Sequence, residues 1–264
     1  MDLGLKGKLA VVSGSTAGIG LAIATTLARE GARVVINGRT AERVKTAAER
    51  IRMELRGAEV TEVASNLGTP EGIAALVEQV PSADILVNNL GIFDPKPFLD
   101  IPDSEWLRFY EVNVMSGVRL TRHYLPGMLE KKWGRVIFIS SESGQQIPAE
   151  MVHYGMTKTA QIAIARGVAE SVAGSGVTVN SVLAGPTASE GVGDFVQSMA
   201  RSRGVSPAQI EKEFFETVRP SSLLKRFETT DEIAAIVAFV ASTQSVGING
   251  AAVRAEGGVV RSIL

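Results

Sequence analysis

The chain has 264 residues, a net charge of −1 and no cysteine. The missing cysteine excludes disulfides, thiolate metal sites and cysteine nucleophiles, and the balanced charge does not favour nucleic acid or an anionic membrane as a partner. No apolar run reaches the roughly 18 residues of a membrane span, and the start of the chain does not have the form of a signal peptide, so we expect a cytoplasmic protein.

Seven short apolar runs alternate with helical patterns along the chain. Most runs are continuously apolar, which is typical of parallel strands that are covered on both faces. We therefore predict an α/β fold in which one domain, 1–264, forms a doubly wound, seven-stranded parallel sheet with helices on both faces. The predicted strands are 9–12, 33–36, 60–64, 84–87, 135–139, 177–182 and 251–253.

Capping residues mark several of the helices between these strands. Thr40 is expected to cap a helix that Gly57 closes, and Thr69 precedes a proline at the first helical position. Thr229 and Glu232 have the spacing of a capping box before the last helix. Further helices are predicted over 103–130 and 153–173.

A glycine-rich turn follows the first strand and leads into a helix over 21–30. Glycines let backbone amides approach a pyrophosphate, and the N-terminus of a helix attracts negative charge. We therefore expect this turn to bind a dinucleotide. It consists of Gly14, Ser15, Thr16, Ala17, Gly18, Ile19 and Gly20.

The turn resembles that of the short-chain dehydrogenase/reductase family, in which Thr-Gly-x-x-x-Gly-Ile-Gly is usual; Ser13 keeps the hydroxyl. The resemblance spans roughly 7–258 and implies a Rossmann-like fold and an NAD- or NADP-dependent oxidoreductase. Further cofactor contacts are implied for Asn66 and Leu67 at the adenine, Asn89 and Gly91 at the adenosine ribose, and Gly185, Pro186 and Thr187 at the nicotinamide.

The pattern is similar to the 3-oxoacyl-carrier-protein reductase-like branch, but several positions depart from family usage. Asn66 stands where an aspartate is frequent, Leu90 replaces an alanine, and Ala184 replaces a proline. These changes caution against assigning a named branch.

The end of the second strand bears on the choice of cofactor. NAD-dependent enzymes place an acid there to bond the adenosine 2′-hydroxyl, but 31–41 contains no acid. Arg39 instead offers a fork of donors that suits a 2′-phosphate. We predict that NADP(H) is preferred over NAD(H).

Tyr154 and Lys158 are four residues apart on a predicted helix, so the phenol and the ammonium share one face. A nearby cation, helped by an oxidised nicotinamide, favours phenolate and lowers the phenol pKa. Ser141 follows a strand at the carboxyl end of the sheet, where its hydroxyl can hold a substrate oxygen. Asn113 is an amide in an otherwise apolar helical stretch, where a satisfied buried amide is equally expected.

These four residues match the family's Asn-Ser-Tyr-Lys tetrad in order and spacing. The resemblance implies that Tyr154 is the general acid/base and that Ser141 polarises the carbonyl. It also implies that Lys158 binds the nicotinamide ribose and lowers the tyrosine pKa, and that Asn113 holds a relay water. His153 is expected to line the entrance of the site, and we expect no catalytic metal because neither histidine has a partner at ligand spacing.

A long insertion, 187–228, separates the sixth strand from the last helix. We expect it to form a mobile lid over the site, with Gly191, Gly193 and Gly204 as joints. Its apolar side chains suggest a mainly apolar ketone or aldehyde as substrate. They include Phe195, Phe214, Phe215, Phe227, Met199, Leu223 and Leu224, and the basic residues between them, including Arg219, are expected to face solvent.

The helix over 153–173 is too apolar to face water. The resemblance implies that it pairs, together with 103–130, across a dimer axis in a homodimer or homotetramer. Two other functions remain open: a sugar-nucleotide epimerase-like enzyme, for which the chain is short, and a non-catalytic nucleotide sensor, against which the complete tetrad argues.

Overall fold

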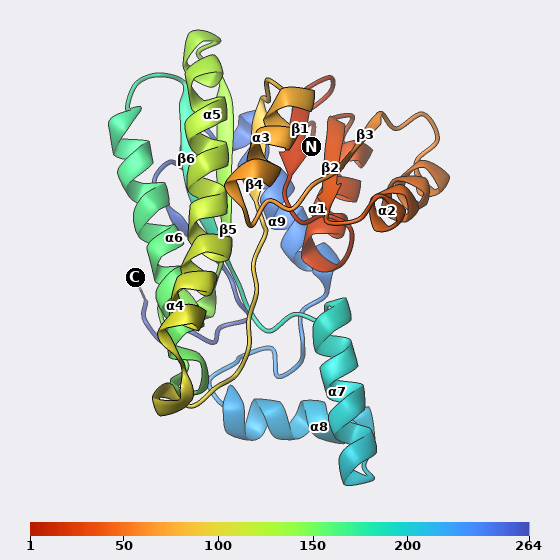
Figure 1. The fold of residues 1–264 in the computed structure, drawn as a ribbon, viewed down its shortest axis with the longest axis vertical. Coiled ribbons are helices and arrows are strands. Elements are labelled where there is room, and N and C mark those ends of the chain that lie inside the picture. Colours follow the sequence, from red (N-terminus) through yellow and green to blue (C-terminus); the bar gives the residue numbers. More distant parts are fainter. Residues whose placement is uncertain (264) are drawn as a thin grey trace.

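The computed structural model describes residues 1–263, except for the side chain of Phe195. All seven predicted strands are present and every pairing is parallel, in the order β3-β2-β1-β4-β5-β6-β7 (Figure 1). The strands are β1 (Leu9–Val12), β2 (Arg33–Gly38), β3 (Val60–Ala64), β4 (Ile85–Asn88), β5 (Gly134–Ser141), β6 (Val177–Ala184) and β7 (Ala252–Ala255).

Helices cover both faces of the sheet, as the apolar strands require. One core layer lies under α1, α2 and α9, and the other lies under α3, α5 and α6. The α-helices are α1 (Gly18–Arg29), α2 (Ala41–Glu54), α3 (Pro70–Gln79), α4 (Asp103–Tyr110), α5 (Ser116–Glu130), α6 (Val152–Ser171), α7 (Glu190–Arg203), α8 (Pro207–Glu213) and α9 (Thr230–Ala241).

The predicted caps form. Thr40 accepts from the Arg43 amide and Thr69 accepts from the Gly72 amide. At the start of α9 both hydrogen bonds of the capping box between Thr229 and Glu232 are present. Local sequence therefore sets where these helices begin.

The predicted helix over 103–130 is interrupted. A π-helical turn, Glu111–Met115, separates α4 from α5, and Asn113 lies in it. Such turns commonly occur at functional sites, because they aim side chains that a regular helix would direct elsewhere. None of the helices in residues 1–263 is long and apolar enough to cross a membrane.

The insertion between β6 and α9 projects beyond the carboxyl end of the sheet as two packed helices, α7 and α8 (Figure 1). A second π-helical turn, Phe214–Val218, continues α8. Gly191 and Gly193 lie inside α7, so they are not the expected joints; Gly204, with φ of 65°, does separate α7 from α8.

Candidate active site

The glycine-rich turn holds a backbone conformation that glycine permits. Gly14 and Gly18 have φ of 62° and 56°, a region that other residues adopt at a cost. No side chain caps the start of α1 and no acid lies in its first turn. The first amides of α1 are thus left for an anion, and the turn fits a dinucleotide pyrophosphate.

Side chains from neighbouring strands brace this turn. Asn89 donates to the carbonyls of Ser13 and Gly14 at 3.0 and 2.9 Å. The Ser15 hydroxyl is fully buried, donates to Val12 O and accepts from the Asn37 amide. Ser15 and Asn89 therefore fix the shape of the turn, and the Ser15 side chain does not face a ligand.

The carboxyl end of β2 carries no acid, and a side chain at its last residue would require Thr16 to move. A Cβ atom at Gly38 would lie 2.4 Å from Cγ2 of Thr16 in the glycine-rich turn. Arg39 follows, exposed and without a hydrogen bond or ion pair to the rest of the described chain. Asn66 is exposed nearby, whereas Leu67 is 1% exposed and packs in the core, so its side chain does not cover an adenine as expected.

Three of the four predicted catalytic residues meet at the carboxyl end of β5. Ser141 is the last residue of that strand, and Tyr154 and Lys158 lie one turn apart on α6. The Lys158 ammonium is 5.5 Å from the centre of the Tyr154 ring. It donates to Ile139 O at 2.8 Å and to Gln161 Oε1 at 3.2 Å, which leaves one of its three donors for a cofactor.

Burial controls the protonation of this group. It lowers the pKa of Lys158 to about 8, an effect that the charge of Glu142 opposes. It raises the pKa of Tyr154, and Glu142 raises it further, against lowering by a hydrogen bond to Ser141 and by the charge of Arg219. The expected lowering of the Tyr154 pKa by Lys158 is not found in the chain by itself, where the phenol keeps its proton at neutral pH.

Asn113 is a satisfied buried amide. Its Oδ1 accepts from the Ile92 amide at 2.7 Å, and its Nδ2 donates to Ile92 O at 2.9 Å and to Thr157 Oγ1 at 3.0 Å. The Asn113 carbonyl accepts from Gln161 Nε2 at 2.6 Å, and Gln161 also receives Lys158. Gln161 thus joins the π-helical turn to the lysine. Gln161 follows Lys158 by three residues on α6, so the sequence already indicates that the two side chains share a face of the helix.

Glu142 and Arg219, which the sequence did not predict as site residues, form an ion pair next to Ser141. The Ser141 hydroxyl donates to the Glu142 carboxylate, and Arg219 Nε donates to the other oxygen of that carboxylate at 2.8 Å. Arg219 is 8% exposed, so the expectation that it faces solvent is wrong. An acid directly after the serine was visible in the sequence, but no local pattern indicates a partner 77 residues away.

The loop after β6 approaches the glycine-rich turn. A Cβ atom at Gly18 would lie 3.4 Å from Cβ of Ser189. Glu228 accepts from the Gly185 amide at 3.1 Å, and the backbone of Glu228 pairs with Pro186 and Ala188. The two ends of the insertion are therefore held together beside Gly185, Pro186 and Thr187.

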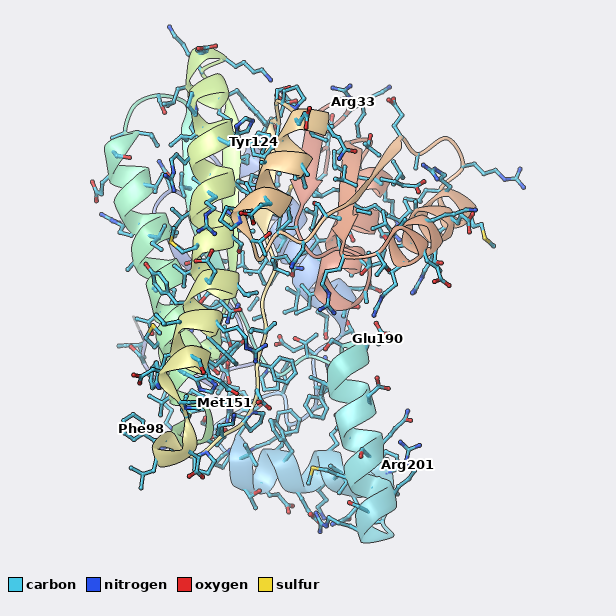
Figure 2. All side chains as sticks on the ribbon, in the orientation of Figure 1. Arg33, Phe98, Tyr124, Met151, Glu190 and Arg201 are labelled. Carbon is cyan, nitrogen blue, oxygen red and sulfur yellow. The ribbon has the colours of Figure 1, made fainter. Side chains whose placement is uncertain are left out.

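A cavity of about 540 Å³ joins these parts. Ser141, Tyr154 and Lys158 line it together with the Gly185–Thr187 loop, and α7, α8 and the second π-helical turn form its outer wall. In Figure 2, Met151 lies on the α6 side of this space, and Glu190 and Arg201 mark α7 on the opposite side. Most of the wall is apolar, through residues such as Phe93, Val192, Val196, Met199, Phe214 and Phe227.

His153 was expected to line the entrance of the site, but it is fully buried. Its ring packs 4.1 Å from that of Phe109 and 5.9 Å from that of Trp106, centre to centre. Burial lowers the pKa of His153, which keeps the imidazole neutral. Within residues 1–263 no three His, Asp or Glu side chains are grouped as metal ligands.

Comparisons with known proteins agree with this geometry. The short chain dehydrogenase family model matches residues 8–200. An uncharacterized oxidoreductase of Bacillus subtilis (strain 168), YvaG, is 49% identical over 263 residues and covers 100% of both chains. The D-beta-hydroxybutyrate dehydrogenase of Rhizobium meliloti (strain 1021) is 34% identical over 95% of this chain and 98% of its own.

Among solved structures, L-sorbose reductase from Gluconobacter frateurii, complexed with NADPH and L-sorbose, superposes with a TM-score of 0.95 at 31% identity over 100% of both chains. The chain therefore belongs to the short-chain dehydrogenase/reductase family, whose enzymes are NAD(P)-dependent oxidoreductases acting on CH–OH groups.

Proposed function

We propose that the protein interconverts a mainly apolar ketone or aldehyde and its alcohol with NADP(H). The observation that carries this proposal is the placement of Ser141, Tyr154 and Lys158 on one wall of a cavity whose other walls are mostly apolar. An apolar cavity with a few convergent polar groups is the usual form of a small-molecule site.

Each polar group has a defined task in this proposal. Tyr154, whose phenol is protonated at neutral pH and whose pKa burial raises further, gives its proton to the carbonyl oxygen during reduction. Ser141 lies beside it and would hold the same oxygen by turning its hydroxyl proton, which Glu142 accepts here, towards the substrate. Lys158 uses its remaining donor on the nicotinamide ribose, and the bound nicotinamide supplies or accepts the hydride.

Asn113 acts on the lysine indirectly. It fixes the π-helical turn against Ile92 and Thr157, and the Asn113 carbonyl holds Gln161 in contact with Lys158. Gln161 therefore connects Asn113 to Lys158, whereas the family resemblance implied that Asn113 holds a relay water.

Three features support NADP(H). No acid stands at the end of β2, Arg39 is free to meet a phosphate, and the L-sorbose reductase structure contains NADPH. The uncapped start of α1 would receive the pyrophosphate, and the Gly185–Thr187 loop would receive the nicotinamide.

Purified protein should oxidise NADPH only when a carbonyl compound from a broad panel is added. Tyr154→Phe keeps the ring but removes the transferable proton, so kcat should fall by at least about a hundredfold. Tyr110→Phe, at an exposed tyrosine of α4, is the matched control and should leave kcat unchanged.

Near-normal turnover of Tyr154→Phe at saturating substrate and cofactor would show that the assigned acid is wrong. Binding of NADPH without turnover of any compound in the panel would instead point to a nucleotide sensor on the same fold.

A further inference from the structure

The cavity contains a buried ion pair next to the catalytic serine. Glu142 is 4% exposed and Arg219 is 8% exposed, and Arg219 also contacts Glu150 through Nη1 at 3.1 Å. The second oxygen of Glu142 accepts from the Ser143 amide at 2.5 Å, the Ser143 hydroxyl at 2.8 Å and the Ser141 hydroxyl. Glu142 is therefore held in a fixed position, and its charge is screened little by solvent.

The charged side chains that line the cavity balance one another. Among its described lining residues, three cations (Lys158, Arg203 and Arg219) accompany three carboxylates (Glu142, Glu150 and Glu213). Arg203 is paired with Glu213 at 2.6 Å, and Arg219 is shared between Glu142 and Glu150. Both guanidiniums of this wall are therefore already paired with carboxylates of the chain.

The Glu142 carboxylate lies next to the Ser141 hydroxyl and lines the same cavity, so a substrate whose carbonyl oxygen is held by Ser141 and Tyr154 would have Glu142 beside its neighbouring carbons. A carboxylate two carbons from the carbonyl would then lie close to the Glu142 carboxylate. Like charges that face each other in a poorly solvated site repel strongly.

On the basis of the proposed function, we propose that the Glu142–Arg219 pair determines specificity by excluding ketones with a nearby carboxylate, so that the physiological substrate is neutral around its carbonyl. This separates the protein from its relative the D-beta-hydroxybutyrate dehydrogenase, whose named substrate carries a carboxylate.

The test compares ketone pairs of equal size that differ only in charge: 3-oxobutanamide with 3-oxobutanoate, and 3-oxohexanamide with 3-oxohexanoate. With NADPH and the unmodified protein, kcat/KM should be at least about tenfold higher for each amide than for its carboxylate, since like-charge contact costs more than that factor. For compounds that are reduced too slowly to give kcat/KM, the Kd of each amide and of its carboxylate is compared instead. Each compound is titrated into the NADPH complex, and the NADPH fluorescence is followed.

Two variants should move this ratio in opposite directions. Glu142→Gln removes the charge and keeps the shape, so it should lower the amide-to-carboxylate ratio towards one or below. Arg219→Gln leaves Glu142 without its cation, so it should raise the ratio. Glu62→Gln, which removes an acid paired with Arg52 on the surface at β3, is the matched control and should not change it.

A carboxylate that the unmodified protein binds or reduces as well as the matched amide would overturn the inference, as would failure to bind either amide. These outcomes differ from failure of the proposed function, which would appear as no NADPH oxidation with any carbonyl compound.

Discussion

In the proposed complex with NADPH, Gly38 and Arg39 would meet the cofactor end that carries the 2′-phosphate. Arg39 has no partner in the described chain, so the phosphate would not have to displace one. Arg39→Ala should therefore weaken NADPH selectively and erode its preference over NADH by about tenfold or more, the worth of a charge-assisted hydrogen bond.

The measurement is kcat/KM for both cofactors at one substrate concentration. Arg33→Ala is the control, because it removes an exposed arginine from the opposite end of the same strand, where Figure 2 labels it. Equal use of NADH and NADPH by the unmodified protein would contradict the assignment.

The ionisation of Glu228 makes the stability of the fold depend on pH next to the Gly185–Thr187 loop. Burial raises its pKa to about 7, against the hydrogen bond from Gly185, which lowers it. The folded chain therefore holds a proton on Glu228 that the unfolded chain releases near its ordinary value of 4.5. This proton stabilises the fold most below that value, and the stabilisation is lost as the pH rises through 7.

Glu228→Gln keeps an acceptor for the Gly185 amide but cannot ionise. The melting temperature of the variant, relative to that of the unmodified protein, should therefore increase as the pH rises from about 5 to 8.5. In the control Glu213→Gln the lost carboxyl has its pKa lowered, chiefly by the hydrogen bond from Arg203, and it is not among the groups that shift the pKa of Glu228, so the difference should stay constant over that range. Parallel curves for Glu228→Gln and the unmodified protein would refute the role of Glu228.

At the scale of elements, we propose that the insertion is a lid. Its two ends are joined by the pairing of Thr187 with Glu228, while α7 and α8 pack mainly on each other. Phe214 and Phe227 line the cavity, and their rings and that of Phe215 lie 5.0 to 5.2 Å apart, centre to centre. Such a unit can move as one body about its base.

If this wall contacts the substrate chain, kcat/KM along a series of 2-alkanones should rise by up to about fourfold per added methylene, which corresponds to about 0.8 kcal/mol. Phe214→Ala should flatten the series. Leu223→Ala, at a residue that is 82% exposed and outside the cavity, should not. Activity that is indifferent to chain length would contradict both the apolar substrate and the lid.

At the scale of the molecule, α4 and α6 lie side by side (Figure 1). Ala163 and Gly167 of α6 are exposed, and Leu107 of α4 is 69% exposed. Small residues allow close approach of a second helix, so we propose that this surface pairs with a second copy of the chain.

Light scattering at micromolar concentration should give a dimer or a larger assembly, and Ala163→Arg should lower the mass. Ala74→Arg places the same charge on an exposed alanine of α3 and should have no effect. A monomer mass for the unmodified protein would refute this assembly.

Features that are local in the chain follow from the amino-acid sequence alone. Strand positions follow from apolar runs, helix starts from Thr40, Thr69 and Thr229, and the grouping of Ser141, Tyr154 and Lys158 from one strand end and one helical spacing. The order of the strands also agrees with a doubly wound sheet, because parallel crossovers leave few alternatives.

Features that depend on residues far apart in the sequence are set by the folding of the whole chain. It buried His153 and Leu67, turned Asn113 inward on a π-helical turn, and brought Arg219 from the insertion onto Glu142. The periodicity of a segment shows which of its faces is apolar. It does not show which residues far apart in the sequence form a buried ion pair. The position of this pair is set by how the insertion folds back over the sheet, and that packing determines the charge a substrate would meet.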